Sequence, residues 1–547
     1  MSAKVVRGLA LIGASLIWSS CTGAGGSGGE GTGGSGGVTG SAGTSGGAGT
    51  TGAAGTTGAA GTTGSGATSG TGGSGTATGS GGGGSSGSGA TGGGIAGTGG
   101  GAAGQGGRGG GTAGAGGTGG GAGTAGTGTA GRGGTGGGSA GRGGTGGGST
   151  AGTTGTGGAT TGTGGLPGNY DKENTGADCP APPAPVAMSA LPMIANLPDP
   201  FLMTNGTRIS TKDQWRCRRA EISSIMQYWE SGPKGAPPSN VTATLSGGTL
   251  RVVITQGSAS ITLSGTLTTP AGNGPFPLII GMNTPTGSLP SSIFSGIATL
   301  TFNSSQLVPD AFNVPRGGGT YFTMYPNTNA GAMIEWAWGV SRLIDGLYQT
   351  ASTNKIDLGH IGVTGCSYQG KMALYAGAFD ERIALTIPEE SGGGGEASWR
   401  FMATQTGTED LDAAQGTAWY ATNLKNFHNA DAPKLPIDMH ELVAMVAPRA
   451  ILAVENTGID RLGSQAGSVS MKAATEVYKA LGIPDRIGFT QAVASAHCSF
   501  PSSQSPDVQA FVDKFLKGNA SANTNIAKSS YNTDLTKWIT WSTPTLQ

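Results

Sequence analysis

The sequence predicts an α/β domain over residues 176–547, with a mainly parallel sheet that helices cover on both faces. Two observations lead to this fold class. The composition changes abruptly near residue 168, because most of the 112 glycines lie before that position. After it, strand-like and helical segments follow one another in alternation, which is the pattern of a parallel sheet packed between helices.

The glycine-rich tract comes first and is expected to lack structure. From Cys21 to Gly165 the chain consists almost entirely of Gly, Ser, Thr and Ala. Burial of apolar surface therefore cannot offset the entropy of ordering it, and we expect residues 21–175 to be a disordered linker. The decapeptide AGRGGTGGGS occurs at 130–139 and again at 140–149. No strand precedes it, as a phosphate-binding loop would require, so a flexible tether with a reach on the order of 60–70 Å is the simplest interpretation.

The first twenty residues have the layout of a secretory signal peptide. Lys4 and Arg7 precede the apolar run Leu9–Trp18, and two serines and Cys21 follow it. This ending is typical of a bacterial lipoprotein signal, in which the cysteine is lipidated. We therefore expect residues 1–20 to be removed and the protein to be secreted, or held on the bacterial outer membrane by a lipid on Cys21. An uncleaved anchor is the alternative, but a run of about ten residues is short for one.

Charge and cysteine content narrow the class of protein. The chain has 30 basic and 30 acidic residues, so nothing points to nucleic acid or to an anionic membrane surface as a partner. No internal stretch resembles a membrane span. Four of the five cysteines remain if Cys21 is lipidated, and an oxidising compartment would allow them to pair. We expect a monomer.

Strand and helix signals begin after a proline-rich stretch, with order expected from near Cys179. Thr211 is a suitable cap for a helix through Trp229, because apolar side chains recur there at helical spacing. Strand-like runs follow at 241–246, 249–255 and 259–270, and an apolar run at 277–282 is typical of a buried parallel strand. We then expect helices at 331–348, 371–379, 440–446 and 475–482, and strands at 361–365, 383–388, 449–456 and 487–493.

Ser367 is the candidate nucleophile, because it lies between a predicted strand and a predicted helix. Gly365 and Gly370 flank it and permit a tight turn, which presents the serine hydroxyl away from the backbone. The helix that follows offers backbone N–H groups and a positive dipole end to an oxyanion. The spacing is G-x-S-x-x-G rather than the strict G-x-S-x-G, so the partners of the serine must carry much of the argument.

Hydrolases with this kind of turn place the acid and then the histidine after the serine. Three histidines follow Ser367. His497 lies in the loop after the final predicted strand, where the base is expected. His440 starts a helical segment, which favours a structural role, and His428 lies in a polar loop.

The acid has more than one candidate. We favour Glu390, which lies just past the predicted strand at 383–388. Glu455 and Asp460 lie past the next strand, where many such hydrolases have their acid, and they remain alternatives. Glu389 would point to the other face of the sheet if the strand extends that far.

Two cysteines adjoin the candidate residues. Cys366 precedes Ser367 and Cys498 follows His497, so the two sulfurs come close if the serine and the histidine meet. A disulfide there would hold both loops in register, and unlinked buried thiols are the alternative. The second bond would then be Cys179–Cys217.

Several segments resemble the glucuronoyl esterases, carbohydrate esterase family 15 of the α/β-hydrolases. GCSYQGK at 365–371 resembles that family's signature GCSRxGK, and the likeness extends over about residues 176–547. The other similar segments are LPDPF at 197–201, WAWGVSR at 336–342, AGAFDERIALTIPEESG at 376–392, LPIDMH at 435–440 and HCSFPSSQ at 497–504.

The resemblance implies a three-layer αβα hydrolase fold and hydrolysis of esters of 4-O-methyl-glucuronic acid. In the plant cell wall these esters join glucuronoxylan to lignin alcohols. By position, the resemblance assigns the nucleophile to Ser367, the acid to Glu390 and the base to His497, and it implies that Lys371 hydrogen-bonds sugar hydroxyls. It also implies the pairs Cys366–Cys498 and Cys179–Cys217. We expect no cofactor, and the histidines are too scattered to form a metal site.

The chain departs from the family pattern at two positions that bear on substrate. Tyr368 replaces the arginine that helps to stabilise the oxyanion, and the loss of one oxyanion donor costs on the order of 100–1000-fold in rate. Arg461 replaces a tryptophan that lines the sugar site, and it could instead bind a free carboxylate on a substrate branch. Glu409 and Gln415 are the nearest candidates for the family's other polar sugar contacts.

The sequence thus predicts a serine esterase that works through an acyl-enzyme, with His497 as general base and then general acid. Two alternatives remain open. One is an esterase for another acyl group, such as a methyl uronate or an acetyl ester. The other is a weakly active carbohydrate-binding protein of the cell surface that has kept the fold.

Overall fold

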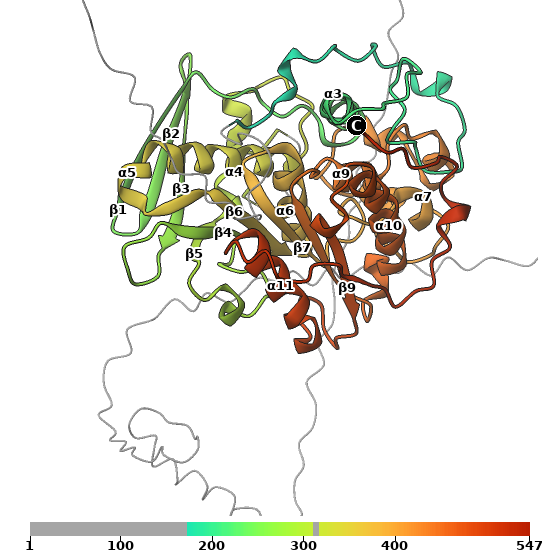
Figure 1. Cartoon of the computed structure of the whole chain (residues 1–547). Coiled ribbons are helices and arrows are strands. Elements are labelled where there is room, and N and C mark those ends of the chain that lie inside the picture. Colours follow the sequence, from blue (N-terminus) through green and yellow to red (C-terminus); the bar gives the residue numbers. More distant parts are fainter. Residues whose placement is uncertain (1–171, 310–316) are drawn as a thin grey trace, which may run out of the picture. The chain divides into compact units, whose positions relative to one another are not determined.

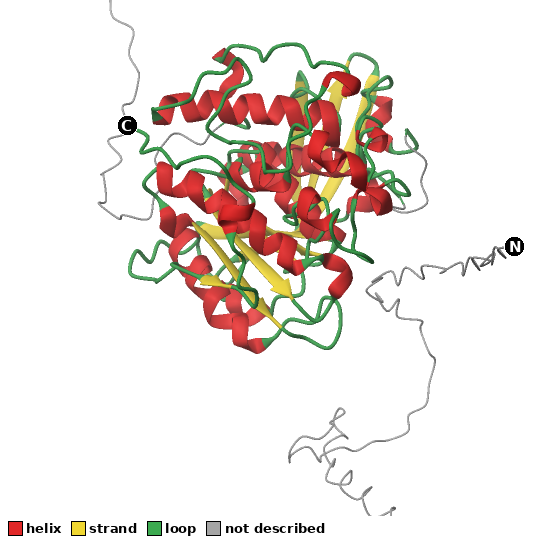
Figure 2. Cartoon of the chain, turned by 90° about the vertical axis from the view of Figure 1, so that its right-hand side faces the viewer, coloured by secondary structure: helices red, strands yellow, loops and turns green. Residues whose placement is uncertain are grey.

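The computed structural model describes residues 172–309 and 317–547, which Figure 1 shows in colour. The predicted signal peptide, Cys21 and all of the predicted linker before residue 172 lie outside the described residues. The described part is built on one sheet of ten strands, and Figure 2 shows helices on both sides of it.

The sheet is antiparallel at its start and parallel over the rest. Its strand order is β1-β2-β3-β5-β4-β6-β7-β8-β9-β10. The pairs β1–β2, β2–β3 and β3–β5 are antiparallel, and every later pair is parallel. The strands are β1 (Asn240–Ser246), β2 (Thr249–Gln256), β3 (Ala259–Thr268), β4 (Phe276–Met282), β5 (Ala298–Phe302), β6 (Ile356–Cys366), β7 (Ile383–Glu389), β8 (Ala450–Asn456), β9 (Ile487–Ala492) and β10 (Ala527–Lys528).

Helices cover the two faces of the sheet unequally. The helices are α3 (Lys212–Met226), α4 (Ala332–Gln349), α5 (Ala351–Asn354), α6 (Tyr368–Phe379), α7 (Trp399–Met402), α8 (Leu411–Ala414), α9 (Met439–Ala444), α10 (Ser464–Ala480) and α11 (Ser505–Phe515). Side chains alternate along β4: Leu278 and Ile280 join the larger core with α4 and α6, whereas Ile279 joins a second core with Phe511 of α11. This confirms the predicted mainly parallel sheet between two helical layers.

The first predicted helix forms as expected. The Thr211 side chain accepts the backbone N–H of Gln214, and the Gln214 side chain accepts the backbone N–H of Thr211, so the helix starts with a capping box. Trp215, Ile222 and Met226 are buried in the larger core. The helix then passes into a π-helical turn at Gln227–Ser231.

The short elements α5, α7, α8 and β10 were not predicted, and three larger differences concern the sheet and its covering helices. Helix α10 begins at Ser464, well before the predicted start at 475, because its first turns are small residues that are buried by packing and carry no apolar stripe. Strand β5 was not predicted, since it has only five residues between irregular segments. Helix α11 was not predicted either, and it supplies much of the second face.

The described domain is anchored by residues just before the expected boundary at 176. Glu173 forms ion pairs with Lys234, at 2.5 Å, and with Arg342. Thr175 donates its backbone N–H to Glu381 at 2.8 Å. Ordered contacts therefore begin a few residues ahead of that boundary.

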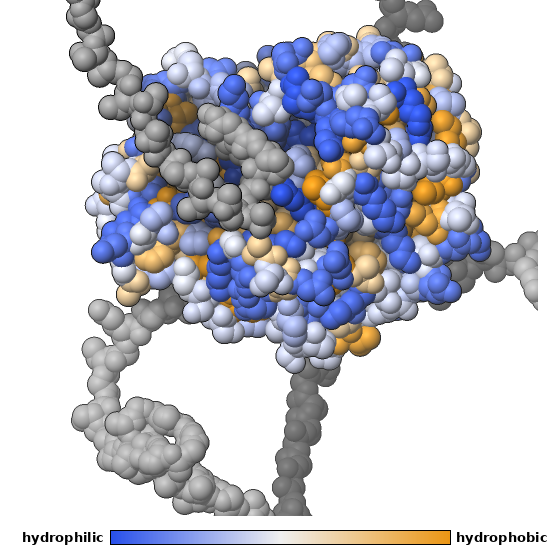
Figure 3. All heavy atoms as spheres, in the orientation of Figure 1, coloured by the Kyte–Doolittle hydropathy of each residue, from blue (hydrophilic) through white to orange (hydrophobic). Residues whose placement is uncertain are grey.

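Hydrophobic residues are scattered over the uncovered part of the face in view. Figure 3 shows hydrophilic and hydrophobic residues intermixed there, as expected of a solvated surface. No helix in the described ranges is both long enough and apolar enough to cross a membrane.

Candidate active site

Ser367 lies on a strained turn between β6 and α6. Its φ of 65° falls in the left-handed region that non-glycine residues rarely adopt. A Cβ atom on Gly365 would lie 2.5 Å from the carbonyl oxygen of Gln369, and one on Gly370 would lie 2.4 Å from that of Glu389. Only glycine fits at both positions, so the sequence produces the tight turn that presents a serine hydroxyl at the start of a helix.

His497 and Glu390 form the hydrogen-bonded pair that a base needs. His497 Nδ1 lies 2.8 Å from Glu390 Oε2, and the same oxygen accepts the backbone N–H of Cys498 at 3.0 Å. The pair comes from loops that follow β9 and β7, which end at the same edge of the sheet as β6. His497 Nε2 is buried and has no hydrogen-bond partner among the described residues, so this nitrogen is available to take a proton.

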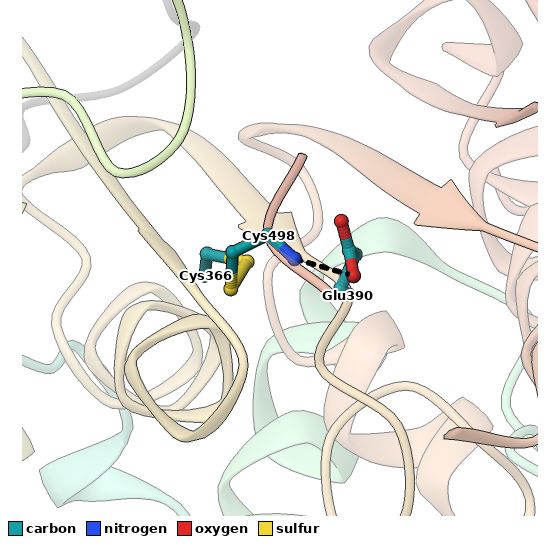
Figure 4. A group of neighbouring side chains, drawn as sticks. All are labelled: Cys366, Glu390 and Cys498. Atoms are coloured by element: carbon teal, nitrogen blue, oxygen red, sulfur yellow. Dashed lines mark hydrogen bonds between the residues drawn. A yellow bond between two sulfur atoms is a disulfide. The ribbon is translucent and has the colours of Figure 1, made fainter. Parts of the chain in front are cut away.

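Two disulfides link the four cysteines of the described chain. Cys366 is bonded to Cys498 and Cys179 to Cys217, with Cα–Cα distances of 5.9 Å and 5.3 Å. Figure 4 shows the first bond beside the carboxylate of Glu390. These three residues place possible metal ligands within 4.8 Å of one another. The sulfurs are joined to each other, however, so they offer no thiolate to a metal.

The other two acid candidates, Glu455 and Asp460, are not the hydrogen-bond partner of His497. Glu455 is 2 % exposed and Glu396 is fully buried. Burial raises the pKa of Glu455 well above its ordinary value, and the nearby charge of Glu396 raises it further. Asp460 lies on the surface in a short helical turn. Glu390 is thus the one of the three candidates to which His497 is hydrogen-bonded in the described structure.

The other two histidines, His440 and His428, contact residues outside the turn of Ser367. His440 is buried, its Nε2 lies 2.9 Å from the carbonyl oxygen of Pro198, and its ring stacks on Trp541. Burial lowers the pKa of His440 to about 4, so it is neutral at physiological pH. His428 is exposed, and its Nδ1 lies 2.6 Å from Asp412.

Three of the predicted substrate-binding residues form one charged cluster. Lys371 is 1 % exposed, and its Nζ donates to Glu409 Oε2 at 2.8 Å and to the carbonyl oxygen of Ser391 at 2.5 Å. Arg461 lies 3.7 Å from the other Glu409 oxygen and is 37 % exposed at its side chain. The carboxylate of Glu409 therefore forms ion pairs with both Lys371 and Arg461.

The hydrogen bonds of the Gln415 side chain lie outside this cluster. Its side-chain amide donates to the carbonyl oxygens of Leu411 and Phe427, at 3.0 and 2.9 Å. Those bonds brace its own loop. The structure does not join it to Lys371 or Arg461.

Tyr368 is the first residue of α6, and its ring lies against Trp419. Its ring stacks on Trp419 with 6.2 Å between ring centroids, and Lys371 Nζ lies 5.4 Å from the centroid of the same indole ring. The Tyr368 hydroxyl accepts the side-chain amides of Asn283 and Gln369, each at 3.4 Å. Neither Trp419 nor Asn283 was predicted from the sequence. The signal available for Trp419 was an aromatic pair, Trp419 and Tyr420, between small residues, whereas no pattern marked Asn283.

Comparisons with known proteins find similar esterases. A family model described as "Glucuronyl esterase, fungi" matches residues 252–482. A 4-O-methyl-glucuronoyl methylesterase of Cerrena unicolor is 44% identical over 373 residues, which cover 64% of this chain and 77% of that protein.

Solved structures of the same kind are similar. The glucuronoyl esterase catalytic domain from Hypocrea jecorina is 40% identical with a TM-score of 0.62, over 67% of this chain and 100% of that one. A serine-to-alanine mutant of the Sporotrichum thermophile glucuronoyl esterase, solved with methyl 4-O-methyl-β-D-glucopyranuronate, is 39% identical with a TM-score of 0.62. That match covers 65% of this chain and 97% of the other.

Proposed function

The chain belongs to the glucuronoyl esterase family, and we propose that it hydrolyses esters of 4-O-methyl-glucuronic acid with Ser367 as the nucleophile. The observation that carries the proposal is the pair His497–Glu390, 2.8 Å apart, at the sheet edge where Ser367 lies on its strained turn. A histidine oriented by a carboxylate, on the same sheet edge as a half-buried serine at the start of a helix, is the arrangement that acyl transfer needs.

In the proposed reaction, His497 Nε2 takes the proton of the Ser367 hydroxyl while its oxygen attacks the ester carbonyl carbon. Backbone N–H groups at the start of α6, with the Tyr368 hydroxyl, stabilise the oxyanion. His497 then gives the proton to the leaving alcohol. Water attacks the resulting acyl-enzyme, again with His497 as base, and releases the free uronate. Glu390 keeps the imidazole in the tautomer whose Nε2 faces the serine.

The sugar would be held by the charged cluster. We propose that Lys371 donates to sugar hydroxyls, with Glu409 fixing its position at 2.8 Å. Arg461 would lie at the outer side of this cluster, since its side chain is the more exposed of the two cations. Gln415 is less suited to bind the sugar, because its amide nitrogen already donates to two carbonyl oxygens of its own loop.

The test is hydrolysis of benzyl glucuronate by the full chain, with Ser367→Ala as the matched inactive variant. We expect turnover in the parent and none above background in the variant. Methyl galacturonate and an acetylated sugar, assayed in parallel, examine the second candidate activity. Turnover of either of these esters without turnover of benzyl glucuronate would reject the proposed substrate and leave the serine mechanism standing.

We also propose that the protein is exported as a monomer, with residues 1–20 as signal peptide, followed by a flexible linker that ends shortly before Glu173 and by the esterase domain up to residue 547. The two disulfides support export, because such bonds persist in oxidising compartments. A lipid on Cys21 would then hold the enzyme at the bacterial surface, within reach of plant cell-wall polysaccharide. Fractionation of a bacterial host tests this: Cys21→Ser should move the protein from the membrane to the soluble fraction.

A further inference from the structure

Glu389 is a buried carboxyl group for which the proposed reaction has no use. It is the last residue of β7, directly before Glu390, and it is 1 % exposed. Its backbone carbonyl oxygen accepts the N–H of Ser367 at 2.9 Å. The main chain of Glu389 therefore already contacts the turn that carries the nucleophile.

The side chain of Glu389 joins two further segments. The backbone N–H of Ser288 donates to Oε2 at 2.9 Å, and the Ser288 hydroxyl donates to the same oxygen. On the other side, Thr364 Oγ1 lies 2.7 Å from Oε1. Thr364 belongs to β6, three residues before Ser367, whereas Ser288 belongs to the loop 283–289 that follows β4. One carboxyl group thus ties this loop to the strand of the nucleophile.

The loop 283–289 borders the place where the oxyanion would form. Strands β4 and β6 are parallel neighbours, so the loop leaves the sheet beside the end of β6. Asn283, its first residue, donates its side-chain amide to the hydroxyl of Tyr368, the residue after Ser367. In α/β-hydrolases, the loop after the strand beside the nucleophile strand supplies one of the two oxyanion N–H donors.

Gly287 is an independent sign that the loop is built onto this carboxyl group. Its φ is +65°, and a Cβ atom there would lie 1.9 Å from Glu389 Oε1. Any side chain would push the loop and the carboxyl group apart. The close approach of the loop to this carboxyl group therefore requires glycine at position 287.

The hydrogen bonds of Glu389 can be kept whether or not it is protonated. Thr364 Oγ1 lies within hydrogen-bond distance of Glu389 Oε1 and also of the carbonyl oxygen of Ile387, at 2.9 Å. A hydroxyl has one proton, so it donates to Ile387 when Oε1 is protonated and donates to Oε1 when it is not. Burial raises the pKa of Glu389 to about 7, so both forms occur near neutral pH.

We propose that Glu389 is a positioning residue for ester hydrolysis: it holds the loop 283–289 against β6 so that the oxyanion donors face Ser367. The inference rests on the proposed function in one respect, namely that Ser367 is the nucleophile. It makes no assumption about the acyl group.

The experiment compares Glu389→Ala and Glu389→Gln in the full chain by two readouts. The first is kcat and KM on benzyl glucuronate. The second is the rate at which diethyl p-nitrophenyl phosphate labels Ser367, followed by intact mass, because phosphorylation of the serine also uses the oxyanion donors. Glu389→Ala should lower both kcat and the labelling rate by about 10–100-fold, part of the loss seen when an oxyanion donor is removed, with KM nearly unchanged.

Glu389→Gln should restore most of both rates. A glutamine can donate to Thr364 and accept from Ser288, as the protonated carboxyl group does. Glu441→Ala is the matched control, because Glu441 is equally buried with a pKa that burial likewise raises to about 7, but it pairs with Arg218 instead. We expect this control to lose stability and to keep kcat.

The outcomes separate the two proposals. Parental kcat and labelling rate in Glu389→Ala, or an equal loss in Glu441→Ala, would overturn the positioning role. Labelling of Ser367 without turnover of benzyl glucuronate would reject only the substrate, and the labelling rates would still decide the inference. If Glu389→Ala does not fold, Gly287→Ala takes its place and should show the same loss of rate with little change in KM. Absence of labelling in the parent would overturn the inference together with the mechanism.

Discussion

The disulfide between Cys366 and Cys498 joins the residue before Ser367 to the residue after His497. The two cysteines are 132 positions apart in sequence, and their Cα atoms lie 5.9 Å apart. The bond therefore holds the loop of the candidate nucleophile beside the loop of the candidate base. Glu390 also holds the loop of the candidate base, since its carboxylate accepts the backbone N–H of Cys498.

Removing this bond in Cys366→Ala/Cys498→Ala should cost about 2–4 kcal/mol of unfolding free energy, because the bond closes a long loop in the unfolded chain. It should also lower kcat, since the spacing of Ser367 and His497 relaxes. Denaturant titration and steady-state kinetics measure the two effects.

The second disulfide provides the control. Cys179–Cys217 closes a loop of 38 positions and lies at the start of the domain. Cys179→Ala/Cys217→Ala should lower stability and leave the kcat of the folded protein unchanged. A fall in kcat of the same size in both variants would argue against a local role for Cys366–Cys498.

The acid can be identified by neutral replacement. Glu390→Gln should lower kcat by about 1000–10,000-fold, the cost of losing the carboxylate that orients a catalytic histidine. Glu455→Gln should stay within a few-fold of the parent, because burial and the neighbouring Glu396 hold the pKa of the Glu455 carboxyl group well above its ordinary value and so favour the neutral form that glutamine resembles. A reversed order of the two kcat values would assign the role to Glu455.

Lys371 depends on Glu409 for its burial. The two side chains are 2 % and 12 % exposed, so Glu409→Gln leaves a buried ammonium group without its counter-charge and should cost about 3 kcal/mol of stability. The double variant Lys371→Met/Glu409→Gln should recover most of that lost stability. Its KM for benzyl glucuronate should still be higher than that of the parent, because Lys371 no longer binds the sugar. Urea unfolding with parallel measurement of KM tests this, and parental stability in Glu409→Gln alone would contradict it.

The stability of the domain should fall as pH rises from about 5 to 8. Burial raises the pKa of Glu389 and Glu441 to about 7 and that of Glu230 to about 8, against about 4.3 in an unfolded chain. In this window the folded state holds protons that the unfolded state has lost, and each group lowers stability by about 1.4 kcal/mol per pH unit until its folded pKa is reached.

His440 acts in the opposite direction, but only below about pH 6.5. Its folded pKa of about 4 means that the unfolded state binds the extra proton there, so stability rises with pH in that range. Above pH 6.5 its effect has ended, whereas the glutamates continue to lower stability as pH rises, and His360, whose pKa is raised by its hydrogen bond to Asp357, acts in the same direction. Thermal midpoints should therefore decline from pH 6.5 to 8, with a shallower decline in Glu230→Gln. Rising midpoints in that interval would refute the prediction.

The hydroxyl of Tyr368 is testable by its removal. Tyr368→Phe keeps the ring stacked on Trp419 and should lower kcat on the order of 100-fold with little change in KM if the hydroxyl serves the oxyanion. Tyr368→Arg should raise kcat by supplying a positive charge. Unchanged kcat in Tyr368→Phe would leave the oxyanion to backbone donors alone.

Much of this fold could be predicted because its signals are local. The apolar run of β4 and the glycines around Ser367 determine a buried strand and a tight turn with little help from distant residues. Strand β5 and the first turns of α10 carry no such signal. The five residues of β5 pair with β3 and β4, and the small residues of α10 are helical because packing buries them.

The site was harder to predict where it depends on side-chain direction. Glu390 directly follows β7, whereas Glu455 is the penultimate residue of β8, and these neighbouring strands end at the same edge of the sheet. Position along the strands alone therefore does not decide which carboxylate turns toward His497. The left-handed backbone of Glu390, with φ of 46°, sets its direction, and no residue pattern announces it. The cluster of Lys371, Glu409 and Arg461 likewise joins segments that lie far apart in the chain.

The burial of α6 has a consequence for how the enzyme loses activity on heating. Every residue from Gly370 to Phe379 is buried, so this helix has little solvent-facing side from which to fray. Its amide hydrogens should exchange with deuterium only through cooperative opening of the whole domain. Ser367 is attached to the start of that helix. Because this helix should open only when the whole domain unfolds, we expect thermal inactivation to coincide with global unfolding. The turn that carries Ser367 should not lose its structure at a lower temperature.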